Sequence, residues 1–163
     1  MAERHGAIRT LVIGLGNPIL GDDGVGWKVV EQLHNRQATA PNLDTDCLSV
    51  GGLTLMERLI GYERAIIVDA VQTQQHPIGS VTPYRLDEMF PAQSGHTTSA
   101  HDTNLWDALQ LGNSLGATLP KDIHIVGIEA EKVYDFTETL TPTVAAAIPR
   151  AVQLVLELLE EER

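Results

Sequence analysis

Cysteine, aromatic residues and long apolar runs are scarce in this chain of 163 residues. Its one cysteine, Cys47, can form no internal disulfide, and a cysteine zinc site needs more thiols. Phe, Trp and Tyr make up only 4% of the residues, so we expect an aliphatic core. No apolar run approaches the ~18 residues that cross a membrane, and the opening "MAERHGAIRT" lacks the apolar stretch of a signal peptide. These absences favour a soluble cytoplasmic protein that does not bind membranes.

Basic residues are also few, and they form no run. The formal net charge is -11, and the chain ends in the acidic segment "ELLEEER". A protein that binds DNA or RNA needs a basic face to displace the counterions of the phosphates. We therefore expect no nucleic-acid partner.

Apolar runs alternate with segments of helical periodicity along the whole chain. Strands are expected at residues 8–17, 43–51, 64–72, 77–86 and 122–130. Helices are expected at residues 24–35, 53–61, 102–116 and 140–163, and a polar loop at 87–101. This alternation predicts a single domain over residues 1–163. Its fold class is α/β: a three-layer αβα sandwich with a mostly parallel, twisted sheet of about five strands flanked by helices.

Several residues predict details of these elements. Pro83 indicates an edge strand, because proline has no N–H to donate to a sheet. In the helix at 102–116 the apolar positions predict an inward face, formed by Leu105, Trp106, Leu109 and Leu111. Thr141 is expected to be the N-cap of the last helix, with Pro142 in its first turn. Pro149 should bend that helix.

The most distinctive segment is "VIGLGNPILGDDGVG" at residues 12–26, a glycine-rich turn between a strand and a helix. It fails the dinucleotide pattern G-x-G-x-x-G, because Ile19 occupies the third glycine position. It also fails the P-loop pattern, because Asp22 and Asp23 replace the lysine and the hydroxyl residue. Two carboxylates would repel a triphosphate. They fit either a cap for the following helix or a ligand for a cation.

Partners for a cation site occur at other strand ends. Asp69 follows the apolar run "AIIV", and an unpaired charge is costly to bury inside a sheet, so we expect it at the carboxyl end of its strand. His101 stands just before the helix at 102–116. With Asp23 these residues offer two carboxylates and one imidazole, a set that suits Ni, Zn or Mn. Spacing alone leaves open whether they converge.

The sequence resembles the hydrogenase maturation endopeptidases, which remove the C-terminal extension of the nickel-containing large subunit of [NiFe] hydrogenases. The resemblance rests on "VIGLGNPILGDDGVG", "IIVDAV", "SAHDTNLWDAL" and "VGIEA…LTPTVAAAIPRAV", in the family's order and spacing. One position departs from the family: many members carry D-G-G-T where this chain has "VGGLT", with Val50 in place of the aspartate. The departure leaves the hydrogenase subtype open.

The resemblance implies a metal site formed by Asp23, Asp69 and His101, with His96 competing for the histidine position. It assigns Gly14, Gly16, Asn17 and Asp22 to the supporting loop. The nickel would belong to the substrate, a large-subunit precursor, and no organic cofactor is implied. Two routes to hydrolysis stay open: the metal activates the peptide bond or a water, or Asp23 or Asp69 acts as general base.

The sequence lacks the motifs of the common protease chemistries. The chain has no G-x-S-x-G elbow and no H-E-x-x-H helix, and we expect Cys47 to be a buried structural thiol. The alternatives to a processing endopeptidase are a general metallo-aminopeptidase or amidase and a non-catalytic chaperone that checks nickel loading. We expect a monomer.

Overall fold

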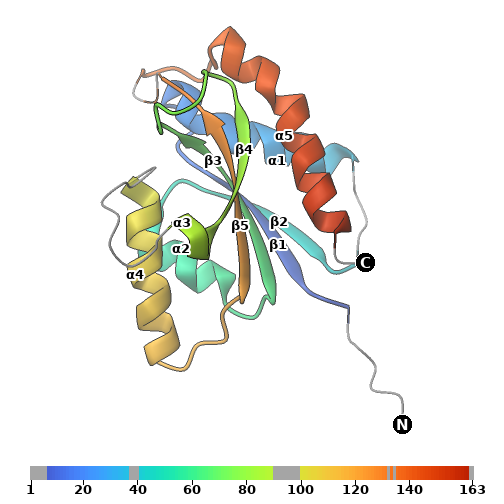
Figure 1. Cartoon of the computed structure of the whole chain (residues 1–163), viewed down its shortest axis with the longest axis vertical. Helices are drawn as coiled ribbons and strands as arrows, with labels where there is room; N and C mark the ends of the chain where they lie inside the picture. Colours follow the sequence, from blue (N-terminus) through green and yellow to red (C-terminus); the bar gives the residue numbers. More distant parts are fainter. Residues whose placement is uncertain (1–6, 37–40, 90–99, 132, 134, 162–163) are drawn as a thin grey trace.

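The computed structural model describes residues 7–36, 41–89, 100–131, 133 and 135–161. In these residues five strands form one sheet in the spatial order β2-β1-β3-β5-β4 (Figure 1). The strands are β1 (Thr10–Leu15), β2 (Leu43–Leu48), β3 (Arg64–Val71), β4 (Val81–Arg85) and β5 (Asp122–Glu129). The predicted sheet of about five mostly parallel strands is confirmed.

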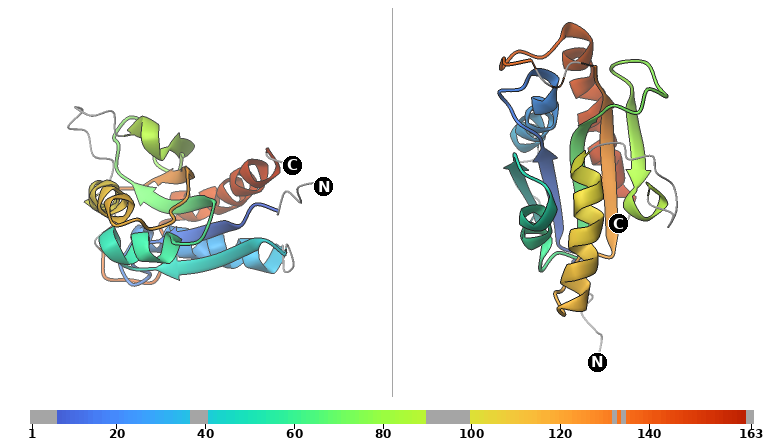
Figure 2. Two further views of the ribbon diagram at one scale, coloured as in Figure 1. Left: turned by 90° about the horizontal axis from the view of Figure 1, so that it is seen from below. Right: turned by 90° about the vertical axis from the view of Figure 1, so that its left-hand side faces the viewer.

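Four of these strands are parallel, so their carboxyl ends share one edge of the sheet. β4 pairs antiparallel with β5 and forms a lateral edge. Pro83 lies in β4, in agreement with the expectation that proline marks an edge strand. In open α/β sheets, sites form beyond the carboxyl ends of the strands, and that end is where the loops that follow β1, β3 and β5 lie (Figures 1 and 2).

Helices cover both faces of the sheet. α1 (Val25–Arg36) and α5 (Pro142–Glu160) lie on one face, and a short 3-10 turn, η1 (Gly21–Gly24), leads into α1. α2 (Gly52–Leu59), α3 (Leu86–Met89) and α4 (Ala100–Ser114) lie on the other face (Figure 1). The three-layer αβα arrangement is therefore as predicted.

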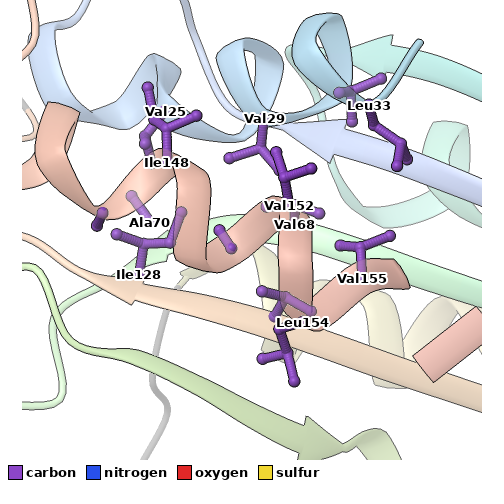
Figure 3. Packing of buried hydrophobic residues seen from close by; sticks show 14 of the residues in the cluster. Val25, Val29, Leu33, Val68, Ala70, Ile128, Ile148, Val152, Leu154 and Val155 are labelled. Atoms are coloured by element: carbon purple, nitrogen blue, oxygen red, sulfur yellow. The ribbon is translucent and has the colours of Figure 1, made fainter. Parts of the chain in front are cut away.

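The core is aliphatic on both faces, as the few aromatic residues indicated. Along β3, Ile66, Val68 and Ala70 pack toward α1 and α5, whereas Ala65 and Ile67 pack toward α2 and α4. Figure 3 shows the first of these clusters. Burial of each large aliphatic side chain stabilises the fold by about 1.5–3 kcal/mol. The alternation of side chains along a strand places Asp69 on the same face as Ala65 and Ile67.

α5 begins at Pro142 after its N-cap Thr141, as the sequence predicted. By length and composition alone its 19 residues would suffice to cross a membrane. Eight of them are instead buried in the domain: Val144, Ala147, Ile148, Ala151, Val152, Leu154, Val155 and Leu158. The apolar residues of this helix therefore form part of the core (Figure 3). Pro149 lies inside the helix, and the bend expected there stays a prediction.

Two local predictions are wrong. Leu111 is 47% exposed rather than inward, because two residues along a helix from buried Leu109 is about 200° around its axis. The polar loop expected at residues 87–101 is shorter at both ends, since α3 extends to Met89 and α4 begins at Ala100. Buried Leu86 fixes the short α3 against the sheet.

Candidate functional site

The loop after β1 turns sharply at Gly16, whose φ is +133°. A Cβ on Gly16 would lie 1.9 Å from the carbonyl oxygen of Asp23, and one on Gly24 would lie 2.8 Å from the Cα of Pro18. Any side chain at these positions would force the backbone apart. The glycines thus let residues 16–24, which we call the first loop, close on themselves.

Asp23 is held inside this loop. Its Oδ2 accepts a hydrogen bond from the backbone N–H of Asn17 at 2.7 Å, and its own N–H donates to the carbonyl of Leu20 at 3.2 Å. The side-chain Oδ1 of Asn17 accepts the N–H of Ile19 at 3.2 Å. The carboxylate of Asp23 is half-buried, with one oxygen engaged by the loop.

Asp22 has a different environment, although it is the next residue in the chain. It is 1% exposed, and its two oxygens accept the backbone N–H of Thr141 at 2.7 Å and the Thr141 hydroxyl at 2.8 Å. Asp22 therefore does not cap the helix that follows it, as one interpretation of the sequence expected, but binds Thr141, the N-cap residue of α5. Its carboxylate bonds the start of α5, not the start of the helix that follows it.

Asp69 lies within β3 and not at its end, which corrects the expectation from sequence. Two further residues, Ala70 and Val71, continue the strand, and Asp69 pairs in register with Gly127 of β5. The Asp69 side chain is fully buried on the face covered by α2 and α4. The strand itself spans nearly the expected residues, but pairing with β5 continues past Asp69 to Val71, so the end of the apolar run is not the end of the strand.

The turn η1, which carries Asp23, contacts β3, the strand that carries Asp69. The first turn of α1 touches the same strand, because a Cβ on Gly26 would lie 2.2 Å from the carbonyl oxygen of Val68. The structure thus brings the elements of the two predicted carboxylate ligands together at the carboxyl edge of the sheet. Such carboxylates attract a cation and repel an anion.

For the predicted histidine ligand, His101, the structure describes the position of the backbone only. His101 is the second residue of α4, not the residue before the helix, and its side chain lies outside the part that the structure describes. His96 also lies outside the described residues. Within the described part of the chain, no three His, Cys, Asp or Glu side chains form a group that could hold a metal ion. The third ligand stays a prediction.

Glu129, at the carboxyl end of β5, is a buried carboxylate that the sequence interpretation missed. It is 2% exposed, and it accepts hydrogen bonds from the backbone N–H of Thr73, at 3.0 Å, and from the Thr73 hydroxyl. It follows "IHIVGI", a segment that is apolar except for its one histidine, much as Asp69 follows "AIIV", so a similar pattern would have indicated it. Burial of Tyr84 and the nearby charge of Glu129 raise the pKa of the Tyr84 hydroxyl, whereas a hydrogen bond with Thr82 partly lowers it.

Cys47 lies in β2 as expected, but it is half-buried, because β2 is the other lateral edge of the sheet. Burial, together with the charges of Asp46 and Glu31, raises the pKa of its thiol to about 11. The nucleophilic form of cysteine is the thiolate. Its environment therefore disfavours a role as nucleophile.

Val50, at the position where the resemblance implies an aspartate, lies just before α2 and is half-exposed. The next residues, Gly51 to Leu53, line a cavity of about 390 Å³ together with Ala108 and Leu111 of α4. The departure thus falls on an exposed position next to this cavity in the sequence, and not in the core.

Comparison with known proteins gives a consistent result. The sequence model of the hydrogenase maturation proteases matches residues 27–158. The hydrogenase 2 maturation protease of Escherichia coli strain K12 is 31% identical over 154 residues, which span 94% of this chain and 92% of that protein. The structure of the hydrogenase maturating endopeptidase HybD from E. coli has a TM-score of 0.81 at 30% identity, over 94% of this chain and 93% of that one. The [NiFe] hydrogenase maturation protease HybD from Thermococcus kodakarensis has a TM-score of 0.71 at 28% identity, over 93% and 99% of the two chains.

Proposed function

The chain belongs to the hydrogenase maturation protease family and is a peptidase, and we propose that it removes the C-terminal extension of the nickel-loaded large-subunit precursor of a [NiFe] hydrogenase. The similarity to the E. coli hydrogenase 2 maturation protease over 94% of the chain is the observation that supports this most directly. The carboxylates at the carboxyl edge of the sheet also support this proposal, because they would attract a substrate that carries a cation.

Asp23, Asp69 and His101 are the residues that we assign to the nickel of the substrate. Imidazole and carboxylate ligands suit this ion. Asp69 is fully buried, and the protein interior screens charges poorly, so a carboxylate there attracts a cation more strongly than one in water. Asp23 offers Oδ1, because Oδ2 is bonded to Asn17. Recognition of the metal would restrict processing to precursors that have received it. No organic cofactor is part of this proposal.

Cleavage needs a polarised carbonyl and a group that accepts a proton from the attacking water. The substrate's nickel would supply the polarisation. Of the two candidate bases, Asp23 is only half-buried whereas Asp69 is fully buried. We therefore assign the transfer of the proton to Asp23, and Asp69 is proposed only as a ligand of the nickel.

The acidic chain is further proposed to act in the cytoplasm as a monomer, without binding nucleic acid or membranes. Net charge of -11 opposes association with phosphate backbones and with anionic lipid surfaces. Its partner is the precursor alone.

Mass spectrometry of a large-subunit precursor, loaded with nickel or nickel-free and incubated with the protein, tests this function. We expect the loaded precursor to lose a C-terminal peptide and the nickel-free precursor to keep its full mass. A loaded precursor that stays intact with every candidate hydrogenase contradicts the proposal.

The alternatives give other outcomes in the same experiment. Turnover of short peptides without any precursor indicates a general aminopeptidase or amidase. Binding of the loaded precursor without a change of its mass indicates a chaperone that only checks the metal.

A further inference from the structure

Thr141 holds the N-cap position of α5, yet its side chain does not cap that helix. The hydroxyl instead donates to Oδ2 of Asp22 at 2.8 Å, and the Thr141 N–H donates to Oδ1 at 2.7 Å. The two residues are 119 positions apart in the chain. A carboxylate near a helix N-terminus is also favoured by the helix dipole. Asp22 therefore binds α5 with both of its oxygens.

The segment before α5 holds the first loop at a second place. Gly21 donates its N–H to the carbonyl of Thr137 at 2.7 Å, and Thr137 donates its N–H to the carbonyl of Ile19 at 3.0 Å. Leu20 and Thr137 form a parallel bridge between these hydrogen bonds. Residues 19–22 are thus fastened on both sides of the bridge to the connection between β5 and α5.

The consequence concerns Asp23, the next residue. Asp22 and Asp23 follow each other in a single turn of 3-10 helix, and their carboxylates bond to different partners, Thr141 and Asn17. α5 is a rigid support, because most of its inner face is packed against α1 and the sheet (Figure 3). A functional group is held accurately when its supporting contacts reach such an element.

We propose that Thr141 is a positioning residue: through Asp22 it fixes the first loop so that Asp23 presents its carboxylate at the carboxyl edge of the sheet. The kinetic part of this inference depends on the proposed function. The structural part does not, because the hydrogen bond between the Asn17 N–H and Asp23 reports the position of Asp23 directly.

Thr141→Val tests the inference, because valine keeps the shape of threonine and loses the hydroxyl. Amide hydrogen exchange at Asn17, followed by NMR in the full chain, should accelerate at least about tenfold in this variant. Thr141→Ser keeps the donor and should exchange like the wild type. Asp22→Asn perturbs the same contact from its acceptor side and should resemble Thr141→Val.

Val144→Ala controls for lost stability, since Val144 lies in the first turn of α5, fully buried in the core between the helices and the sheet. It should lower the melting temperature and leave exchange at Asn17 close to that of the wild type. If Thr141 has a purely structural role, Thr141→Val should behave like Val144→Ala: the melting temperature falls, and exchange at Asn17 stays close to that of the wild type.

Kinetics with the nickel-loaded precursor provide a second measurement. We expect Thr141→Val to lower kcat about tenfold, since small displacements of a catalytic group reduce rates by such factors, and we expect Thr141→Ser to restore it. Unchanged exchange at Asn17 in folded Thr141→Val and in Asp22→Asn overturns the inference. If the wild type does not cleave any loaded precursor, the proposed function fails, while the exchange measurement still decides the role of Thr141.

Discussion

Gly14 of β1 and Gly26 of α1 meet backbone to backbone. A Cβ on Gly14 would lie 2.5 Å from the carbonyl oxygen of Gly26, and a Cβ on Gly26 would lie 2.2 Å from the carbonyl oxygen of Val68. This contact brings the start of α1 down onto β1 and β3. The first loop, which ends at α1, is consequently held near the strand that carries Asp69. The glycines of this segment therefore allow close packing of the backbone, and they do not form a phosphate-binding loop.

Gly26→Ala should therefore destabilise the protein strongly. The added methyl group meets backbone atoms on two strands, which cannot rotate away as a side chain can. We expect a loss of about 3 kcal/mol or more in the free energy of unfolding, at the upper end of the usual cost of overpacking. Urea denaturation measures this loss.

Gly112→Ala is the matched control. Its Cβ would meet Sδ of Met56 at 2.9 Å, the end of a flexible side chain, and alanine favours the helix α4. We expect the free energy of unfolding to change by less than about 1 kcal/mol in either direction. Equal losses in the two variants would mean that the contact between the backbones is not tight.

The contact between Glu129 and Thr73 gives a second prediction. Thr73→Val removes the hydroxyl donor and leaves a buried carboxylate with one hydrogen bond fewer. The free energy of unfolding should fall by about 1–3 kcal/mol. Thr73→Ser keeps the donor and should stay near the wild type, and a serine variant as unstable as the valine variant would assign the loss to the methyl group instead.

The fold was predictable, because buried strands appear as apolar runs and helices as apolar residues at helical spacing. Asp69 was predictable as a functional candidate, because a charge directly after an apolar run is unusual. Glu129 has the same signature and was overlooked. The contact of Asp22 with Thr141 was not predictable, since it joins residues 119 positions apart and no local pattern encodes it. Tertiary proximity of this kind appears only in the folded chain.

Cys47 should be unreactive and dispensable. With its pKa raised from 9.0 to about 11 by burial and by neighbouring carboxylates, the thiol stays protonated at pH 8. The thiolate fraction at that pH is much lower than for an unperturbed thiol, so iodoacetamide should modify Cys47 at least about tenfold more slowly in the folded protein than in urea. Mass spectrometry over time measures both rates. Cys47→Ala should process the precursor at the wild-type rate, and a loss of turnover in that variant would reopen the question of a cysteine nucleophile.

The assignment of the metal-contacting residues is tested by variants that keep the fold. Asp23→Asn keeps the shape of the side chain but removes its negative charge. We propose that this carboxylate binds the nickel and accepts the proton of the attacking water, and the amide can do neither well. We expect kcat/KM for the nickel-loaded precursor to fall about 100-fold or more. Asp87→Asn is the matched control, because Asp87 is an exposed carboxylate whose ion pair with Arg85, at 3.4 Å, contributes little.

His101→Ala should lose processing to the same extent, whereas His96→Ala and His34→Ala should not. His34 is an exposed residue in the last turn of α1, far in the sequence from both candidates, and it controls for the loss of an imidazole as such. Circular dichroism confirms that each variant is folded. Loss of processing in His96→Ala with full activity in His101→Ala would transfer the ligand role to His96. Full activity in both would exclude His96 and His101 as ligands and contradict the imidazole ligand that we propose for the nickel.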